Sequence, residues 1–139
     1  MVKTLKNIAE GNDLETYMDI DNLLRYMAVH VFSVNEDSLS GMMAHNYYLY
    51  EYNEQLNIIP WDYNLALGGM SGSGATSVVN EAIDNAFSGT DFFDTLMENE
   101  TYHAQYYEYL RRLVDEYING GGFDEFYERV RSQIDALVE

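Results

Sequence analysis

Hydrophobic residues recur at helical spacing through most of the chain. The clearest segment starts at Asp19, where apolar side chains follow one another at three- and four-residue intervals and form one continuous face. Its members are Ile20, Leu23, Leu24, Met27, Ala28, Val31 and Phe32. Asp19 and Asp21 stand at its beginning, where carboxylates cap free amide groups and complement the helix dipole. This pattern predicts a long helix with one buried face.

Further helices are predicted on both sides of this one. A short helix from Val2 is stopped by Gly11-Asn12, and a long helix near the C-terminus is closed by three glycines, Gly120 to Gly122. The stretch from Ser33 to Ala44 loses the helical period and is expected to be a loop, and 75–90 is expected to be irregular. In chain order, the remaining apolar clusters predict a turn at 14–18 and helices at about 92–97, 102–118 and 123–138.

One segment changes to a strand pattern. Asn46–Tyr52 (NYYLYEY) and Leu56–Pro60 (LNIIP) predict two strands joined by 53–55, a loop length typical of a tight hairpin. Pro60 is the only proline, and it ends the second strand because it has no N–H for the ladder. The predicted fold class is therefore α+β, predominantly α, with one embedded β-hairpin.

Length and composition indicate one folded domain over residues 1–139. The net charge of −17 repels phosphate backbones and anionic membranes, so we expect no nucleic-acid partner. No apolar run approaches the roughly 18 residues of a membrane span. The absence of cysteine excludes thiol catalysis and thiolate metal sites. Both lysines, Lys3 and Lys6, precede every motif discussed below.

Two aspartates flank the predicted hairpin. Asp37 lies in the loop after the long helix, and Asp62 follows Pro60 and the only tryptophan, Trp61. Since a hairpin returns the chain, both carboxylates can approach the same edge of the domain. Phosphoryl transfer uses such a pair, one aspartate accepting the hydroxyl proton and another holding the metal on the phosphates. Hard oxygen ligands suit magnesium or manganese.

Several segments together resemble the spore-coat protein H (CotH) kinase family of atypical protein kinases. They are DIDNLLRYMAVHVFSVNEDS, HNYYLYE, IIPWDYNLALGG and ATSVVNEAID, and the similarity runs from about Leu5 to the C-terminus. The resemblance implies a kinase-like C-terminal lobe, ATP with Mg or Mn, and phosphate transfer to serine in a coat or surface protein. It implies Asp37 as the catalytic aspartate and Asp62 as the metal-binding one. The implied location is a spore coat, or the exterior or cell surface of a bacterium.

The chain departs from the ordinary kinase pattern at several positions. Met42 stands where a kinase loop has its asparagine, five residues after the catalytic aspartate, and Asn46 is the nearest substitute. Asn64 replaces a second acid that some relatives carry, and His45 is a further supporting candidate. The small lobe, with its phosphate-gripping lysine and paired glutamate, is expected before Leu5 and outside this chain. We therefore expect this chain alone to be inactive and its N-terminal lobe to be a partner.

Other interpretations stay open. Asp37 and Asp62 could cap turns, Trp61 could serve packing alone, and His45 and Asn46 could orient the loop by hydrogen bonds. The glycine-rich segment 68–74 lacks the lysine of a P-loop and resembles the start of an activation segment more than a phosphate cradle. The competing function is a non-catalytic structural protein of the spore coat or bacterial surface. A carbohydrate-associated module would need an exposed aromatic stripe, which sequence does not distinguish from a buried one.

Overall fold

The computed structural model describes residues 2–70, 76, 78, 80–84 and 91–138. Within them, helices surround a single two-stranded antiparallel sheet, which confirms the predominantly α, α+β class. The elements are α1 (Val2–Ala9), α2 (Leu14–Tyr17), α3 (Ile20–Ser33), β1 (Tyr47–Tyr52), β2 (Gln55–Pro60), η1 (Tyr63–Leu65), α4 (Asp91–Met97), α5 (Glu100–Arg112), η3 (Leu113–Asn119) and α6 (Gly122–Val138).

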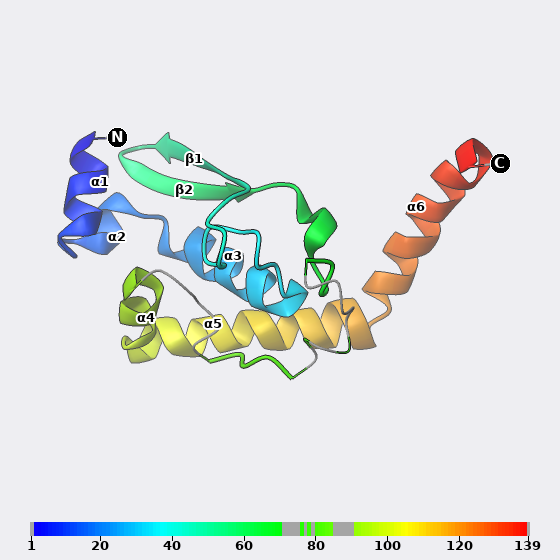
Figure 1. Cartoon of the computed structure of the whole chain (residues 1–139). Coiled ribbons are helices and arrows are strands. Elements are labelled where there is room, and N and C mark those ends of the chain that lie inside the picture. The colour runs from blue at the N-terminus through cyan, green and yellow to red at the C-terminus, as the bar shows by residue number, and fades with distance from the viewer. Residues whose placement is uncertain (1, 71–75, 77, 79, 85–90, 139) are drawn as a thin grey trace.

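The core lies around α3, which is placed between the hairpin and α5 (Figure 1). The apolar face predicted from its spacing is buried, and Leu23, Leu24 and Met27 are fully enclosed. Ile58 from β2 and Tyr106 from α5 cover it from opposite sides. Each such side chain contributes about 1.5–3 kcal/mol on burial, so this layered contact is the main source of stability.

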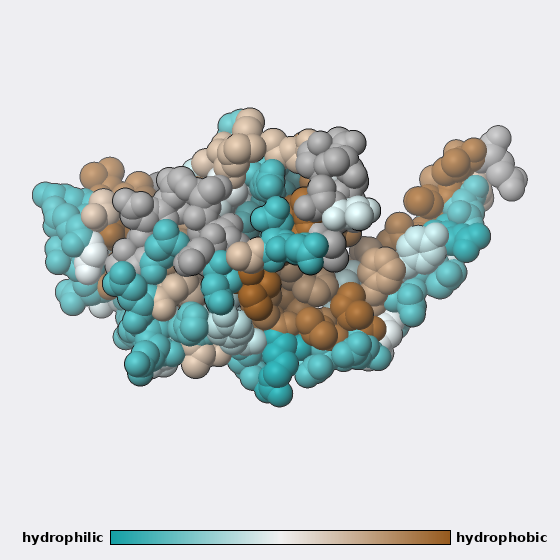
Figure 2. All heavy atoms as spheres, turned by 60° about the horizontal axis from the view of Figure 1, so that its bottom comes forward, coloured by the Kyte–Doolittle hydropathy of each residue, from teal (hydrophilic) through white to brown (hydrophobic). Residues whose placement is uncertain are grey.

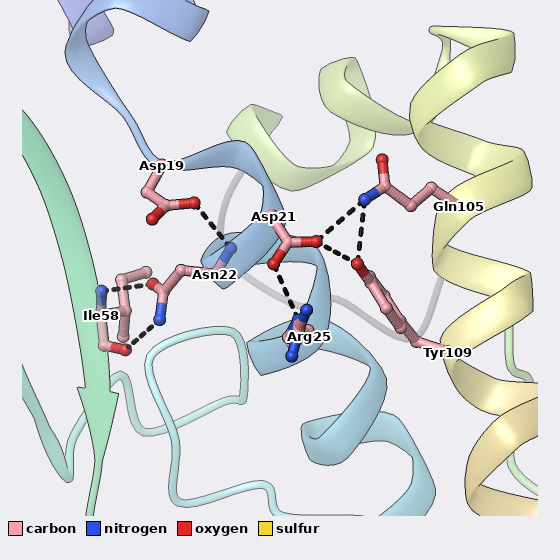
Figure 3. A network of polar contacts seen from close by, with 7 residues as sticks. All are labelled: Asp19, Asp21, Asn22, Arg25, Ile58, Gln105 and Tyr109. Atoms are coloured by element: carbon pink, nitrogen blue, oxygen red, sulfur yellow. Dashed lines mark hydrogen bonds and ion pairs between the residues drawn. The ribbon is translucent and has the colours of Figure 1, made fainter.

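Polar contacts fix the start of α3 against β2. The Asp19 carboxylate accepts the N–H of Asn22 at 3.0 Å, which confirms the predicted cap. The Asn22 side chain then bonds both backbone groups of Ile58, accepting its N–H at 2.8 Å and donating to its carbonyl at 3.2 Å (Figure 3). Because a side-chain amide replaces the missing strand neighbour here, the position of β2 along α3 is defined to within one residue.

A second polar cluster joins α3 to α5. The Asp21 carboxylate forms an ion pair with Arg25 at 2.8 Å and accepts hydrogen bonds from Gln105, at 3.0 Å, and from the Tyr109 hydroxyl (Figure 3). The guanidinium of Arg25 lies 5.1 Å from the centre of the Tyr109 ring. Asp21 therefore does more than complement the helix dipole, since it also connects two helices.

The hairpin differs from its predicted bounds at both ends. Asn46 is not part of β1, because its φ of 57° is left-handed and the ladder begins with Tyr47 opposite Pro60. Gln55 belongs to β2 and pairs with Tyr52, which leaves a two-residue turn. Both turn residues, Asn53 and Glu54, have positive φ (51° and 66°), the geometry of a type I′ turn that matches strand twist.

The long C-terminal helix predicted over 102–118 is two segments. Ordinary α-helix ends at Arg112, and Leu113–Asn119 continues as a π-helix before Gly121, whose φ is 81°. The helix predicted over 123–138 is confirmed as α6, and it projects away from the other helices (Figure 1). Figure 2 shows hydrophobic side chains along one side of it, where Phe126, Tyr127 and Ile134 are exposed.

We predict that Asn22→Ala destabilises the fold by about 2 kcal/mol, since it leaves the backbone N–H and carbonyl of Ile58 without their partner. Urea denaturation measures the effect. Asn12→Ala is the matched control, because Asn12 is exposed and donates only to Glu10. Equal unfolding free energies for the two variants would show that the amide contacts do not hold β2.

Candidate functional site

The loop between α3 and β1 is anchored to two α3 side chains one helical turn apart. The hydroxyl of Tyr26 accepts the backbone N–H of Leu39 at 2.8 Å. The Ser38 hydroxyl and the Nδ1 atom of His30 share a hydrogen bond inside the protein, where both residues are buried. These contacts hold the centre of the loop against α3, directly beside Asp37. They also assign His30 a structural role, as its isolated position in the sequence suggested.

The loop is more buried than its polar sequence predicts. Asn35, Ser38 and Ser40 are all at most 1% exposed. The turn also requires glycine at position 41, since a Cβ there would lie 2.3 Å from the carbonyl oxygen of Glu36. Buried polar groups in such a loop favour one conformation, because most alternatives would leave them without partners.

Asp37 faces two of the predicted supporting residues. Its Oδ2 atom accepts a hydrogen bond from the Asn46 amide at 2.7 Å, and its Oδ1 lies 3.8 Å from Nδ1 of His45. The Asp37 side chain is 14% exposed, whereas His45 is 65% exposed. The Asp37 backbone N–H also donates to the side chain of Asn35 at 3.3 Å. Asn46 thus orients one carboxylate oxygen and leaves the other directed at a solvent-accessible imidazole.

Asn46 also connects this carboxylate to the segment that bears Asp62. The backbone N–H of Trp61 donates to the Asn46 carbonyl at 3.1 Å, one step beyond the last ladder pair. Asp62 follows with a left-handed backbone (φ 57°, ψ 63°), its carboxylate is exposed, and it does not cap η1. A left-handed non-glycine residue costs about 1 kcal/mol or more and often occurs at functional positions.

The other predicted positions are placed less centrally. Asn64 lies in η1 and is exposed, and among the described residues no hydrogen bond joins it to Asp37 or Asp62. The packing interpretation of Trp61 holds only in part, because the ring is 46% exposed and stacks on Tyr48. Most of the glycine-rich segment 68–74 lies outside the described residues, so its predicted role stays a prediction.

The donor set fits a metal that arrives with phosphates. The described part of the chain has no group of three or more His, Asp or Glu side chains that could hold a metal ion. Magnesium is usually bound by one or two carboxylates, with phosphate oxygens and water completing its octahedron. An exposed carboxylate such as Asp62 suits that mode and does not suit an all-protein cage.

Tyr63 and Tyr26 form a buried phenolic pair beneath the site that the sequence did not indicate. Burial raises the pKa of Tyr63 to about 12, and the charge of Tyr26 acts in the same direction. The amide of Asn35 opposes this shift, although the two groups do not meet with full hydrogen-bond geometry. Burial also raises the pKa of Tyr26, against hydrogen bonds from the Ser38–Ser40 segment. Both tyrosines interrupt no apolar period, so no sequence signal distinguished them.

A comparison with protein-family models matches the whole chain, residues 1–139, to the family described as CotH kinase protein. The chain is therefore a kinase-like protein. It belongs to the CotH kinase family, which is associated with spore coats. No curated protein and no solved structure gave a significant match. Among the described residues, no helix combines the length and apolar character that a membrane span requires.

We predict that the protein loses stability as pH rises from 10 towards 12, partly through Tyr63. The pKa of this phenol is about 12 in the folded state and 10.0 as a model value. Its neutral form therefore contributes fully below pH 10, and this contribution disappears as pH passes through the folded-state pKa. Urea unfolding across this range should show a smaller pH-dependent loss for Tyr63→Phe than for the wild type.

The exposed Tyr50 provides the control for this pH dependence. Tyr50→Phe should keep the wild-type slope. If Tyr63→Phe also keeps that slope, the hydroxyl of Tyr63 is not held in a desolvated position beneath the loop.

Proposed function

We propose that this chain is the catalytic-lobe part of an ATP-dependent protein serine kinase, with Asp37 as its catalytic aspartate and Asp62 as its metal-binding aspartate. The connection from the Asp37 carboxylate through Asn46 to the backbone of Trp61 carries this proposal. It brings the two ends of the hairpin-containing segment together, so that Asp62 begins one residue from a group in contact with Asp37.

Each side chain has a defined part in the proposed reaction. Asn46 holds Oδ2 of Asp37, and Oδ1 then accepts or orients the proton of the attacking serine hydroxyl. His45 stands at the entrance to this oxygen. Asp62 offers its exposed carboxylate to magnesium or manganese bound to ATP, and that metal neutralises charge on the phosphates. Asn64 is proposed as a neutral neighbour of the metal.

The phosphates also need a cation that the described residues do not place near Asp62. Lys3 and Lys6 belong to α1, which lies beside the turn end of the hairpin, and η1 lies at the other end (Figure 1). The hydrogen bond from Thr4 to Glu51 fixes α1 there at 2.7 Å. We therefore propose that an N-terminal lobe of the same protein supplies the phosphate-binding lysine and that the present chain alone has no turnover.

The proposed substrate is a serine-bearing coat or surface protein, because the family is associated with spore coats. The corresponding location is the spore coat, the cell surface or the exterior of a bacterium. A second candidate is a non-catalytic structural protein in the same places. One observation favours it: Asp37 is already engaged by Asn46, as a purely structural carboxylate would be.

Binding of manganese–ATP to the full chain tests the metal role. We predict that Asp62→Asn weakens binding at least about tenfold, since it removes the charge that holds the metal, a loss of ~1.4 kcal/mol. Asp37→Asn should stay within about twofold, because Asp37 acts on the hydroxyl. Isothermal titration calorimetry gives both values.

Asp94→Asn is the matched control, since Asp94 is an exposed carboxylate on α4. It should bind like the wild type. If the wild type binds no manganese–ATP, or Asp62→Asn binds as tightly as the wild type, Asp62 is not a metal ligand and the structural candidate is favoured.

A further inference from the structure

The hairpin has one packed face and one open face. Leu56 and Ile58 of β2 point into the core and are at most 3% exposed. The opposite face carries Tyr48, Tyr50 and Tyr52 of β1, each between 51% and 61% exposed. In Figure 1 this face of the hairpin is directed away from α3 and α5. The tyrosines of α5, by contrast, pack towards the core, so the two aromatic stripes of the sequence have different roles.

The exposed rings form two flat pairs in a row. Tyr48 stacks on Trp61 with ring centres 5.8 Å apart and planes 25° apart. Tyr50 and Tyr52 lie 6.5 Å apart with planes only 8° apart. Alternate residues on a strand are separated by about 6.6 Å, so the row follows the strand direction. The paired strand β2 holds it rigid, and tyrosine and tryptophan therefore lose little entropy on binding.

The polar groups on this face are neutral. Asn57 stands opposite Tyr50, and Gln55 stands opposite Tyr52 with its amide donating to the backbone of Glu15 at 2.8 Å. Each tyrosine adds a hydroxyl. The one carboxylate of the two strands, Glu51, alternates to the other face and accepts a hydrogen bond from Thr4. The face thus combines aromatic planes with amide and hydroxyl groups and has no charged side chain of its own.

This chemistry selects among ligand classes. Nucleic acids and anionic lipids are repelled by the net charge of −17. A lysine or arginine partner would be desolvated over the rings without a counter-charge on the strands. Sugar rings suit both features, because their C–H faces pack on aromatic planes and their hydroxyls pair with amides and phenols. A face with these groups and no charge complements a neutral ligand.

We propose that the outer face of the hairpin binds a neutral polysaccharide, whose sugar rings lie flat on the Tyr48–Trp61 and Tyr50–Tyr52 pairs. This site is separate from the proposed phosphoryl-transfer chemistry and does not depend on it. It would attach a kinase-like domain to a cell-wall or plant-type glycan. The carbohydrate-associated interpretation, which the sequence could not support, gains its aromatic stripe from the structure.

Affinity electrophoresis in gels that contain hydroxyethyl cellulose, xylan, galactomannan or β-1,3-glucan tests the proposal. The full chain should be retarded by at least one of them, and the same glycan should change the fluorescence of Trp61, the only tryptophan. The double variant Tyr50→Ala/Tyr52→Ala should bind about tenfold more weakly, as expected for loss of two stacked rings. Polygalacturonate, an anionic glycan, should cause no retardation.

Tyr127→Ala is the control, because Tyr127 is a tyrosine of similar exposure on α6. It should bind like the wild type, and circular dichroism should confirm that all variants stay folded. Absence of retardation by every neutral glycan would overturn the proposal. It would also be overturned if Tyr50→Ala/Tyr52→Ala binds glycan normally, or if the double variant loses manganese–ATP binding instead, which would make this face part of the nucleotide site. Retardation that follows dimer formation would assign the face to a second copy.

Discussion

One row of polar groups on α3 holds every part of the candidate site. Asn22 bonds to β2, Tyr26 and His30 bond to the loop that carries Asp37, and the carbonyl of Ser33 accepts the N–H of Leu67 at 2.6 Å. These four positions follow at four-, four- and three-residue intervals, so they lie along one side of the helix. Apolar contacts alone would tolerate sliding, whereas hydrogen bonds to backbone groups fix the register of each attached segment. The site geometry therefore depends on α3.

Much of the fold could be predicted because apolar spacing determines which segments become helices and strands. The buried face of α3, the cap at Asp19 and the strand end at Pro60 all follow from local rules. The misses lie where backbone geometry departs from those rules. The sequence does not indicate that Asn46 adopts a left-handed conformation or that the helix after Arg112 changes to π geometry. Neither feature alters the apolar pattern.

The candidate site was predictable in its end points and not in its connections. Asp37 and Asp62 were proposed from a motif resemblance, and the structure adds Asn46 as the residue that contacts one and leads to the other. The buried support under the loop could not be predicted, since Asn35, Ser38 and Ser40 have the composition of a solvated turn. Their burial arises from long-range packing against α3, which a local pattern does not encode. The exposure of the hairpin tyrosines likewise depends on what packs against each strand face.

The most direct test of the account is labelled-phosphate transfer from manganese or magnesium ATP by the complete protein, in which an N-terminal lobe accompanies this chain. The wild type should phosphorylate serine, and both Asp37→Asn and Asp62→Asn should reduce the rate by at least about a thousandfold, since each removes a group that acts in the transition state. A folded wild-type protein without transfer, or variants that retain it, would contradict the account and show that these carboxylates are structural.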